Sequence, residues 1–243
     1  MKPKIITLDK LDTVDPASEC FIVKNTLSKE ECKSIVDFLH VFMMQNDENV
    51  RYRGENWHYF VRSNNNYFDS FLFNDLSSLG SSLLTSAYFN LFKLYNTLGE
   101  STFYNDFGRE ITISDFTTTF KVINPLVFWY LNSRSKFGFH KHDVRSQKFQ
   151  LLTNLTQPGY DYLGGETWVY MSKGKPDLSD CNLKDKCVVF DEDFEIGDTF
   201  SFPYDRWHKV ESSFDASYTG GKRISLLMPL GARNNTNYKN EYL

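Results

Sequence analysis

The sequence lacks any long hydrophobic run. None of its apolar stretches approaches the roughly 18 to 20 residues that a helix needs to cross a bilayer. The first residues, MKPKIITLDKLDTVDP, contain neither the apolar core nor the cleavage site of a signal peptide. We therefore expect a soluble, cytoplasmic protein with no membrane partner.

A basic excess is also missing. Lysine and arginine number 27 against 31 aspartates and glutamates, which gives a formal net charge of −4. A general nucleic-acid binder needs a strongly basic surface, because neutralising phosphates supplies most of its affinity. We therefore expect no nucleic-acid partner.

Cysteine and histidine are scarce. The four cysteines, at positions 20, 32, 181 and 187, do not form the CxxC pairs of a zinc site, and without a secretion signal we predict free thiols. Only five histidines occur, so two of them in the short stretch FGFHKHDVRS are conspicuous. We interpret His40 and His58 as ordinary surface or partly buried residues.

Aromatic residues are plentiful, at 16% of the 243 residues, with 22 Phe and 14 Tyr. Such a composition suits the broad buried faces of sandwiches and barrels. Near the N-terminus, a short strand, CFIVKN, precedes a helix over residues 28–44, where Ser28 and Glu31 form a capping-box signature. Apolar residues at helical spacing predict a second helix over residues 70–98, ended by Gly99.

From residue 111 the pattern changes to short β-branched and aromatic runs separated by Gly, Pro and Asp, which predict at least seven strands. These runs are residues 111–123, 126–132, 150–156, 166–171, 186–191, 198–202, 207–211 and 223–230. Helices followed by strands predict a mainly β fold with N-terminal helices, as a β-sandwich or small barrel. We divide this single domain into a helical support region (1–110), a β core (111–232) and a polar tail (233–243).

His140 and His142 stand two residues apart, so on a strand both side chains point to one face. His208 lies in IGDTFSFPYDRWHKV, at the start of another predicted strand. Further on, Arg223 and Ser225 again share one face of a strand of Ile, Leu and Met. An arginine there is costly unless its charge is paired, and a carboxylate of a ligand is a reasonable partner.

The order HxH/D, then Gly164-Gly165-Glu166, then GD…F…H, then RxS resembles the iron(II)- and 2-oxoglutarate-dependent dioxygenases, which are built on a double-stranded β-helix. The resemblance covers about residues 121–230, and the opening FIVKNTLSKEECKSIVDFL is similar to the prolyl-hydroxylase branch. It implies Fe(II), 2-oxoglutarate and dioxygen as cofactors, with ascorbate as a candidate reductant.

The resemblance assigns roles to individual residues. It makes His140 and His208 the metal-binding histidines and Arg223 the partner of the 2-oxoglutarate C5 carboxylate, with Ser225 as its hydroxyl helper. Tyr130, ten residues before His140, matches a cosubstrate-binding tyrosine. Two imidazoles and one carboxylate with open positions suit non-haem Fe(II).

The sequence departs from the family where the carboxylate should stand, because that position is His142 and Asp143 follows it. A local bulge can turn Asp143 inward to complete a normal triad. Alternatively, His142 is the third ligand, or neither binds metal and Asp143 holds a cationic substrate. The family's halogenases carry a small residue here, and histidine is not small, so we do not expect halogenation.

The implied activity is hydroxylation of an unactivated C–H bond in a small molecule, with a free amino acid or related metabolite as the expected substrate. Asp143, Arg145 and Asn154 are candidate substrate contacts. Alternatives are a prolyl- or lysyl-type protein hydroxylase, a non-catalytic β-helix binding protein, and a cupin-like enzyme with three histidines. The sequence gives no oligomeric state.

Overall fold

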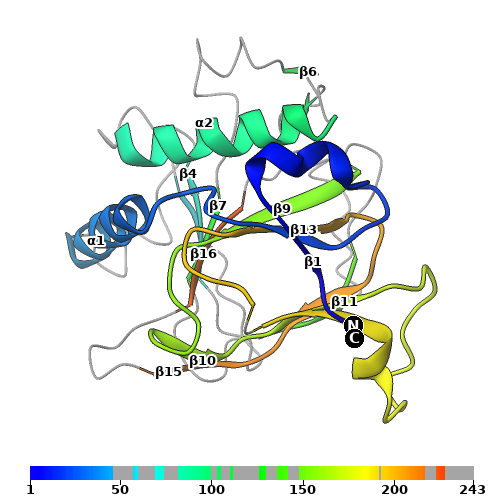
Figure 1. The fold of residues 1–243 in the computed structure, drawn as a ribbon. Helices are drawn as coiled ribbons and strands as arrows, with labels where there is room; N and C mark the ends of the chain where they lie inside the picture. The colour runs from blue at the N-terminus through cyan, green and yellow to red at the C-terminus, as the bar shows by residue number, and fades with distance from the viewer. Residues whose placement is uncertain are drawn as a thin grey trace.

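The computed structural model describes residues 1–45, 57–59, 69–73, 82–99, 103–104, 110–111, 126–129, 136–141, 148–191, 193–216 and 223–227. Two sheets, antiparallel except for the parallel pair β1 and β2, face one another in this part of the chain, and the helices α1 and α2 lie outside the larger sheet (Figure 1). From residue 126 onward the chain passes repeatedly from one sheet to the other, with only β11 and β12 of the described strands consecutive in one sheet, which wraps it as a double-stranded β-helix. The predicted fold class is confirmed.

The large sheet has eight described strands in the order β1-β2-β13-β9-β16-β7-β4-β3. Their bounds are β1 Lys4–Ile6, β2 Phe21–Val23, β13 Thr199–Pro203, β9 Phe149–Asn154, β16 Ile224–Leu227, β7 Leu126–Trp129, β4 Asp69–Phe73 and β3 Trp57–Tyr59. Strands β1 to β4 come from the region expected to be helical support, so that region also extends the sheet at both edges. Of residues 52–73, only the strands β3 and β4 are described.

The small sheet has the order β12-β11-β14-β8. Its strands are β12 Cys187–Phe190, β11 Thr167–Tyr170, β14 His208–Val210 and β8 Phe137–His140. Two short ribbons accompany the sheets: β10 (Tyr162–Gly164) with β15 (Ser213–Asp215), and β5 (Phe103–Tyr104) with β6 (Glu110–Ile111). Seven of the eight runs predicted as strands contain one; of the run 111–123, only residue 111 is described.

The core between the sheets follows from the period of two along each strand. In the large sheet, Phe200 of β13 pairs with Leu152 of β9 and with Ile22 of β2, so these side chains share one face. They form one buried cluster with Val169 and Val188 of the small sheet. Burial of this apolar area stabilises the fold, at about 25 cal/mol for each square ångström removed from water.

The opposite face of the large sheet packs against helix α2 (Ser82–Thr97). Tyr95 is fully buried; its ring stacks on Phe149 with centroids 5.2 Å apart, and its hydroxyl accepts a hydrogen bond from the Leu151 amide. Gly99, at φ +88°, follows the helix as predicted. However, the prediction of helix across residues 70–98 was wrong at its start, because Asp69–Phe73 is strand β4.

Helix α1 (Lys29–Gln45) begins with the predicted capping box. The Ser28 amide donates to the Glu31 carboxylate over 2.7 Å, and the Glu31 amide donates to the Ser28 hydroxyl over 3.1 Å. These reciprocal bonds satisfy amide groups that a helix N-terminus otherwise leaves unpaired. Short 3-10 helices η1 (Leu8–Thr13) and η4 (Leu183–Lys186) complete the described helical segments.

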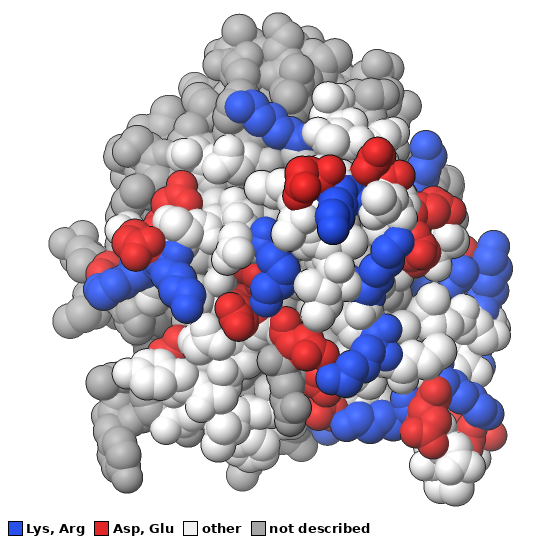
Figure 2. Space-filling view, viewed as in Figure 1, with Lys and Arg blue, Asp and Glu red and all other residues white. Residues whose placement is uncertain are grey.

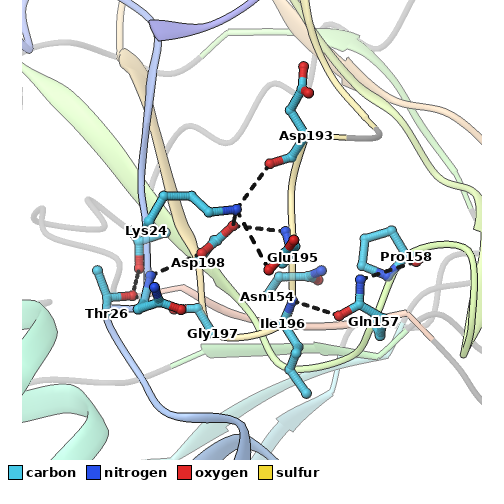
Figure 3. Close-up of polar contacts among 12 residues, drawn as sticks. Lys24, Thr26, Asn154, Gln157, Pro158, Asp193, Glu195, Ile196, Gly197 and Asp198 are labelled. Carbon is cyan, nitrogen blue, oxygen red and sulfur yellow. Dashed lines mark hydrogen bonds and ion pairs between the residues drawn. The ribbon is translucent and has the colours of Figure 1, made fainter. Parts of the chain in front are cut away.

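A buried carboxylate ties the N-terminal region to the β core (Figure 3). The Asp198 side chain is fully buried and accepts bonds from the Lys24 ammonium over 2.7 Å and from the amides of Asn25 and Glu195. Beside it, Gly197 has φ +83°, and a Cβ there would lie 2.1 Å from the Leu27 carbonyl oxygen. The Gly-Asp pair therefore forms a turn that only glycine fits and that one ion pair anchors.

The four cysteines are free thiols, as predicted, and only Cys181 is exposed. Burial raises the pKa of Cys20 and Cys32 to about 12 and that of Cys187 to about 11. These three thiols therefore stay protonated at neutral pH. Charges on the surface are mixed, with basic and acidic side chains interspersed over the face shown in Figure 2. Neither described α-helix is long and apolar enough to span a bilayer.

We expect Asp198→Asn to destabilise the protein by about 3 kcal/mol, because it leaves the Lys24 charge without its buried partner. Urea unfolding of the purified variant measures this loss. The matched control is Asp37→Asn, which breaks the exposed Lys33–Asp37 pair of helix α1 and should cost about 0.5 kcal/mol or less. Equal losses in the two variants would contradict the anchoring role of Asp198.

Candidate metal and carboxylate site

Two of the predicted site residues, His140 and His208, lie side by side on neighbouring strands of the small sheet. His140 ends strand β8 and His208 begins strand β14, and the two residues pair directly in the antiparallel register. Their ring centroids lie 4.2 Å apart, with the ring planes inclined at 56°. His208 also pairs with Val169, a buried residue of the core cluster, so both rings face the interior between the sheets.

The neighbours of the two histidines face outward. The Lys141 ammonium lies 5.6 Å from the Trp207 ring centroid, and the Lys209 ammonium lies 3.5 Å from the Trp168 ring centroid. Cations over aromatic rings on the outer face fix the pleat, because the adjacent histidines must then point inward. Trp207 is buried in a hydrophobic cluster on this outer side of the small sheet, and Trp168 packs against the same cluster.

A β-bulge lies beside the histidine pair. Val210 pairs with Phe137 while His208 pairs with His140, so β8 holds one residue more than β14 between these two pairs. The bulge therefore precedes His140, whereas the bulge considered for Asp143 would follow it. It shifts the register so that His140, and not Phe139, stands beside His208.

Each imidazole is oriented by a carbonyl oxygen two residues before it. His140 Nδ1 lies 2.9 Å from the Gly138 oxygen, and His208 Nδ1 lies 3.0 Å from the Arg206 oxygen. A carbonyl only accepts, so Nδ1 carries the proton in both neutral rings and Nε2 carries the lone pair. This arrangement is typical of metal-binding histidines, whose outer hydrogen bond fixes the tautomer. The two residues fit a metal such as Fe(II).

The other two predicted metal ligands, His142 and Asp143, lie outside the described residues. So do Arg145, a predicted substrate contact, and Tyr130, a predicted cosubstrate contact. Within the described ranges, no group of three or more His, Cys, Asp or Glu side chains could hold a metal ion. Asp143 and His142 therefore both stay predicted candidates for the third ligand.

Arg223 lies buried just before strand β16, with 2% of its surface exposed. Its guanidinium donates to the Gly165 carbonyl over 2.5 Å and to the Thr167 hydroxyl over 3.0 Å. Both acceptors are neutral and come from the segment that opens β11. A Cβ on Gly165, which has φ +70°, would lie 3.2 Å from Arg223 Cδ. Sequence reasoning missed these two supports, although the Gly-Gly-Glu motif marked the segment.

Ser225 faces the same interior as Arg223 and is 1% exposed. Its hydroxyl has no hydrogen-bond partner among the described residues. Asn154 pairs with Ser225 across β9 and β16, and its amide nitrogen donates to the Thr156 carbonyl and to the Tyr162 hydroxyl. A buried hydroxyl without a partner next to a buried guanidinium fits a carboxylate ligand, which accepts from both.

The Glu166 side chain points to the outer face of the small sheet, away from Arg223 and Ser225. Its carboxylate accepts from the Trp168 indole over 2.7 Å and pairs with the Lys184 ammonium over 2.9 Å, on the outer face of the small sheet. Burial alone would raise the pKa of Glu166, but the bonds from Lys184 and Trp168 outweigh it and lower the pKa. The interpretation of Glu166 as a surface charge of the strand fits these contacts.

Comparison with known proteins finds similarity at the level of structure. No protein-family model and no curated protein matches the sequence. The non-haem α-ketoglutarate-dependent epimerase SnoN of nogalamycin biosynthesis superimposes with a TM-score of 0.56 and 13% identity, over 91% of this chain and 81% of that one.

Two hydroxylase structures are also similar. A prolyl-4-hydroxylase of Pseudomonas putida gives a TM-score of 0.54 and 12% identity, over 92% of this chain and 96% of that one. A prolyl hydroxylase of Trichoplax adhaerens, in complex with a hypoxia-inducible factor peptide, gives 0.51 and 14%, over 90% and 86%. The chain has the fold of these oxygenases. At 12 to 14% identity the likeness establishes architecture, and the chemistry has to come from the residues of the site.

The hydrogen bonds at Nδ1 make a prediction about the metal-free protein. We expect both His140 and His208 to carry the Nδ1-protonated tautomer at about pH 8, where a histidine of ordinary pKa is neutral. Long-range ¹H–¹⁵N NMR correlation of the imidazole rings distinguishes the tautomers, and His140→Gln and His208→Gln variants assign the signals. Nε2-protonated rings at either position would contradict the proposed orientation.

Proposed function

We propose that this protein is an Fe(II)- and 2-oxoglutarate-dependent oxygenase that hydroxylates a C–H bond of a small molecule, with a free amino acid or related metabolite as substrate. The observation that carries the proposal is the interior pair of His140 and His208, each held at Nδ1 by a carbonyl oxygen. The buried Arg223 lies about two strand residues away from this pair. Neither the histidine pair nor the arginine is needed for packing, because apolar side chains in their place would make the interior more stable.

The distance between the two features suits the cosubstrate. Arg223 bonds to Thr167, which pairs with Val210, and His208 is two residues before Val210 on the same strand. Two residues of strand span about 7 Å. A five-carbon diacid is long enough to place one carboxylate on Arg223 and its other end at the histidines.

Each described residue then has a physical role. His140 and His208 hold Fe(II) through Nε2, and the Gly138 and Arg206 carbonyls keep the rings oriented. Arg223 binds the distal carboxylate of 2-oxoglutarate by charge-assisted bonds, and the Ser225 hydroxyl donates to the same group. Bound iron supplies the activation of dioxygen, with oxidation of 2-oxoglutarate to succinate and CO₂. The apolar cluster around Phe200 and Leu152 keeps water from the interior.

Two alternatives lead to different measurements. A non-catalytic β-helix binding protein would bind neither Fe(II) nor 2-oxoglutarate. A protein side-chain hydroxylase would release succinate with a peptide and not with a free amino acid. The two prolyl hydroxylases of similar structure make the second alternative worth testing, while the epimerase of similar structure acts in nogalamycin biosynthesis.

We expect His140→Ala and His208→Ala to weaken Fe(II) binding by more than about 100-fold, since outer partners of a metal ligand alone contribute 10- to 100-fold. Anaerobic reconstitution with Fe(II) and 2-oxoglutarate provides the readout, through the weak visible absorption band of the chelate and through equilibrium metal binding. His40→Ala, in helix α1, is the control and should bind as the wild type does. Wild-type succinate production by His208→Ala would refute the assignment.

Thr167→Val tests the support of Arg223. It removes the hydroxyl that accepts from the guanidinium while keeping the side-chain shape, so we expect 2-oxoglutarate to bind about 10-fold more weakly, about 1.4 kcal/mol. Calorimetric titration of 2-oxoglutarate into the Mn(II)-loaded protein measures the change, and Mn(II) affinity itself should hold. Thr167→Ser retains the hydroxyl and should restore most of the affinity. Equal affinity in Thr167→Val and wild type would show that Thr167 does not position Arg223.

A further inference from the structure

Two further polar side chains lie buried at the other end of the histidine pair. Gln150, on β9, is 5% exposed, and Arg206, in the turn between β13 and β14, is 9% exposed. Gln150 pairs with Phe202 across the large sheet, and the Phe202 ring lies 4.6 Å from the His208 ring. Arg206 supplies the carbonyl that accepts from His208 Nδ1. Gln150 and Arg206 therefore lie close to His208 in the fold.

The strand registers place this pair opposite the carboxylate site. Along β9, Asn154 pairs with Ser225, Leu152 pairs with Phe200, and Gln150 pairs with Phe202. These three residues of β9 share the inner face, so Gln150 lies about 13 Å along the strand from the end that holds Ser225. The inner face of β9 therefore has a polar residue at each end, and Gln150 stands at the end nearer the histidines.

Each of the two side chains has an unmet hydrogen-bonding atom. Gln150 Oε1, an acceptor, and Arg206 Nε, a donor, are buried with no partner among the described residues. The only ion pair of Arg206 among those residues is from Nη1 to the Asp205 carboxylate, over 2.5 Å. Buried polar atoms are nearly always paired in folded proteins, so two such atoms near the histidine pair indicate a ligand that provides both partners.

The position of the Arg206 head group supports an inward direction. The guanidinium is close enough to the Cys20 thiol to favour its thiolate, which offsets part of the effect of burial on the pKa of Cys20. Cys20 belongs to the interior cluster with Phe202 and Leu152. The guanidinium therefore lies near the Cys20 end of this cluster, and the Asp205 carboxylate, which accepts from Nη1, leaves the buried Nε–H for another acceptor.

We propose that Gln150 and Arg206 form the substrate subsite, and that it takes a free α-amino acid: the Arg206 Nε–H donates to the α-carboxylate, and the Gln150 carbonyl oxygen accepts from the α-ammonium group. This inference rests on the proposed function for the role of the ligand as a substrate. The chemistry is complementary in both senses, since a zwitterion offers one anionic acceptor and one cationic donor. A peptide segment lacks both charged groups, so it offers these atoms only a neutral carbonyl and a neutral N–H, which bind more weakly than charged partners.

If Gln150 had a purely structural role, its removal would lower the melting temperature of the ligand-free protein, and the proposed subsite predicts that it does not. A buried acceptor without a partner destabilises the folded protein. Gln150→Leu removes it at similar volume, so the melting temperature of the ligand-free variant should equal or exceed that of the wild type. Ser201→Ala is the matched control. The Ser201 hydroxyl is also buried without a described partner, but Ser201 pairs with Leu151 and so faces the helix side of the sheet.

The experiment uses the full chain, with and without Mn(II) and 2-oxoglutarate, and measures binding of the common L-amino acids by calorimetry. Each amino acid is compared with its N-acetyl derivative and its α-carboxamide. We expect at least one free amino acid to bind to the wild type and to bind at least 10-fold more tightly than either derivative. Gln150→Leu should abolish the preference over the N-acetyl form, and Arg206→Gln the preference over the carboxamide. Ser201→Ala should keep both preferences.

The outcomes separate the two proposals. If no amino acid binds, or if both preferences persist in Gln150→Leu and Arg206→Gln, the subsite is overturned even when Mn(II) and 2-oxoglutarate bind. If amino acids bind with the expected preferences while Mn(II) and 2-oxoglutarate do not, the subsite stands and the oxygenase proposal fails. A lower melting temperature of Gln150→Leu with unchanged binding would assign Gln150 a structural role and also overturn the inference.

Discussion

The cross-strand pairing of His140 with His208 is the constraint on which the candidate site depends. A shift of one residue between β8 and β14 would turn one imidazole to the outer face, where the lysines lie over the indoles. The bulge before His140 sets the register, and the lysine–aromatic contacts on either side hold it. Packing on the outside of the small sheet therefore determines which side chains meet inside it, and the Nδ1–carbonyl bonds then choose the atom that each ring presents.

Buried charge is treated in two ways in this protein. Asp198 is neutralised within the chain by Lys24 and by two backbone amides, and its partners leave little reason to invoke a ligand. Arg223, by contrast, is held by a carbonyl and a hydroxyl, which orient the guanidinium without supplying an opposite charge. The first arrangement joins the N-terminal region to the β core. The second orients a guanidinium that, in the proposed function, binds an anion, and it lies beside a serine hydroxyl that has no hydrogen-bond partner among the described residues.

Local patterns in the sequence predicted much of this structure. The capping box at Ser28, the strand runs and the inward histidine at position 140 each depend on neighbours in the chain, and each is present. The short run at Asp69–Phe73 was assigned to a helix because five residues do not distinguish the two periods, and its pairing with distant β7 decides for a strand. The supports of Arg223 come from a segment 56 to 58 residues away, and no local pattern reveals such contacts. Gln150 was invisible for the same reason, since only the register across β13 places it beside His208.

Strand β9 explains how one sheet can satisfy folding and binding together. Its outward residues, Phe149 and Leu151, meet Tyr95 of helix α2, whereas its inward residues, Gln150, Leu152 and Asn154, line the interior at steps of about 7 Å. Because successive side chains point to opposite faces, a substitution at an inward position leaves the contact with the helix unchanged. The middle step, Leu152, is apolar and belongs to the core, while the two ends are polar. In the proposed subsite, selectivity for a ligand can therefore change at position 150 without loss of the pairing at Ser225 or of the packing that holds the sheet.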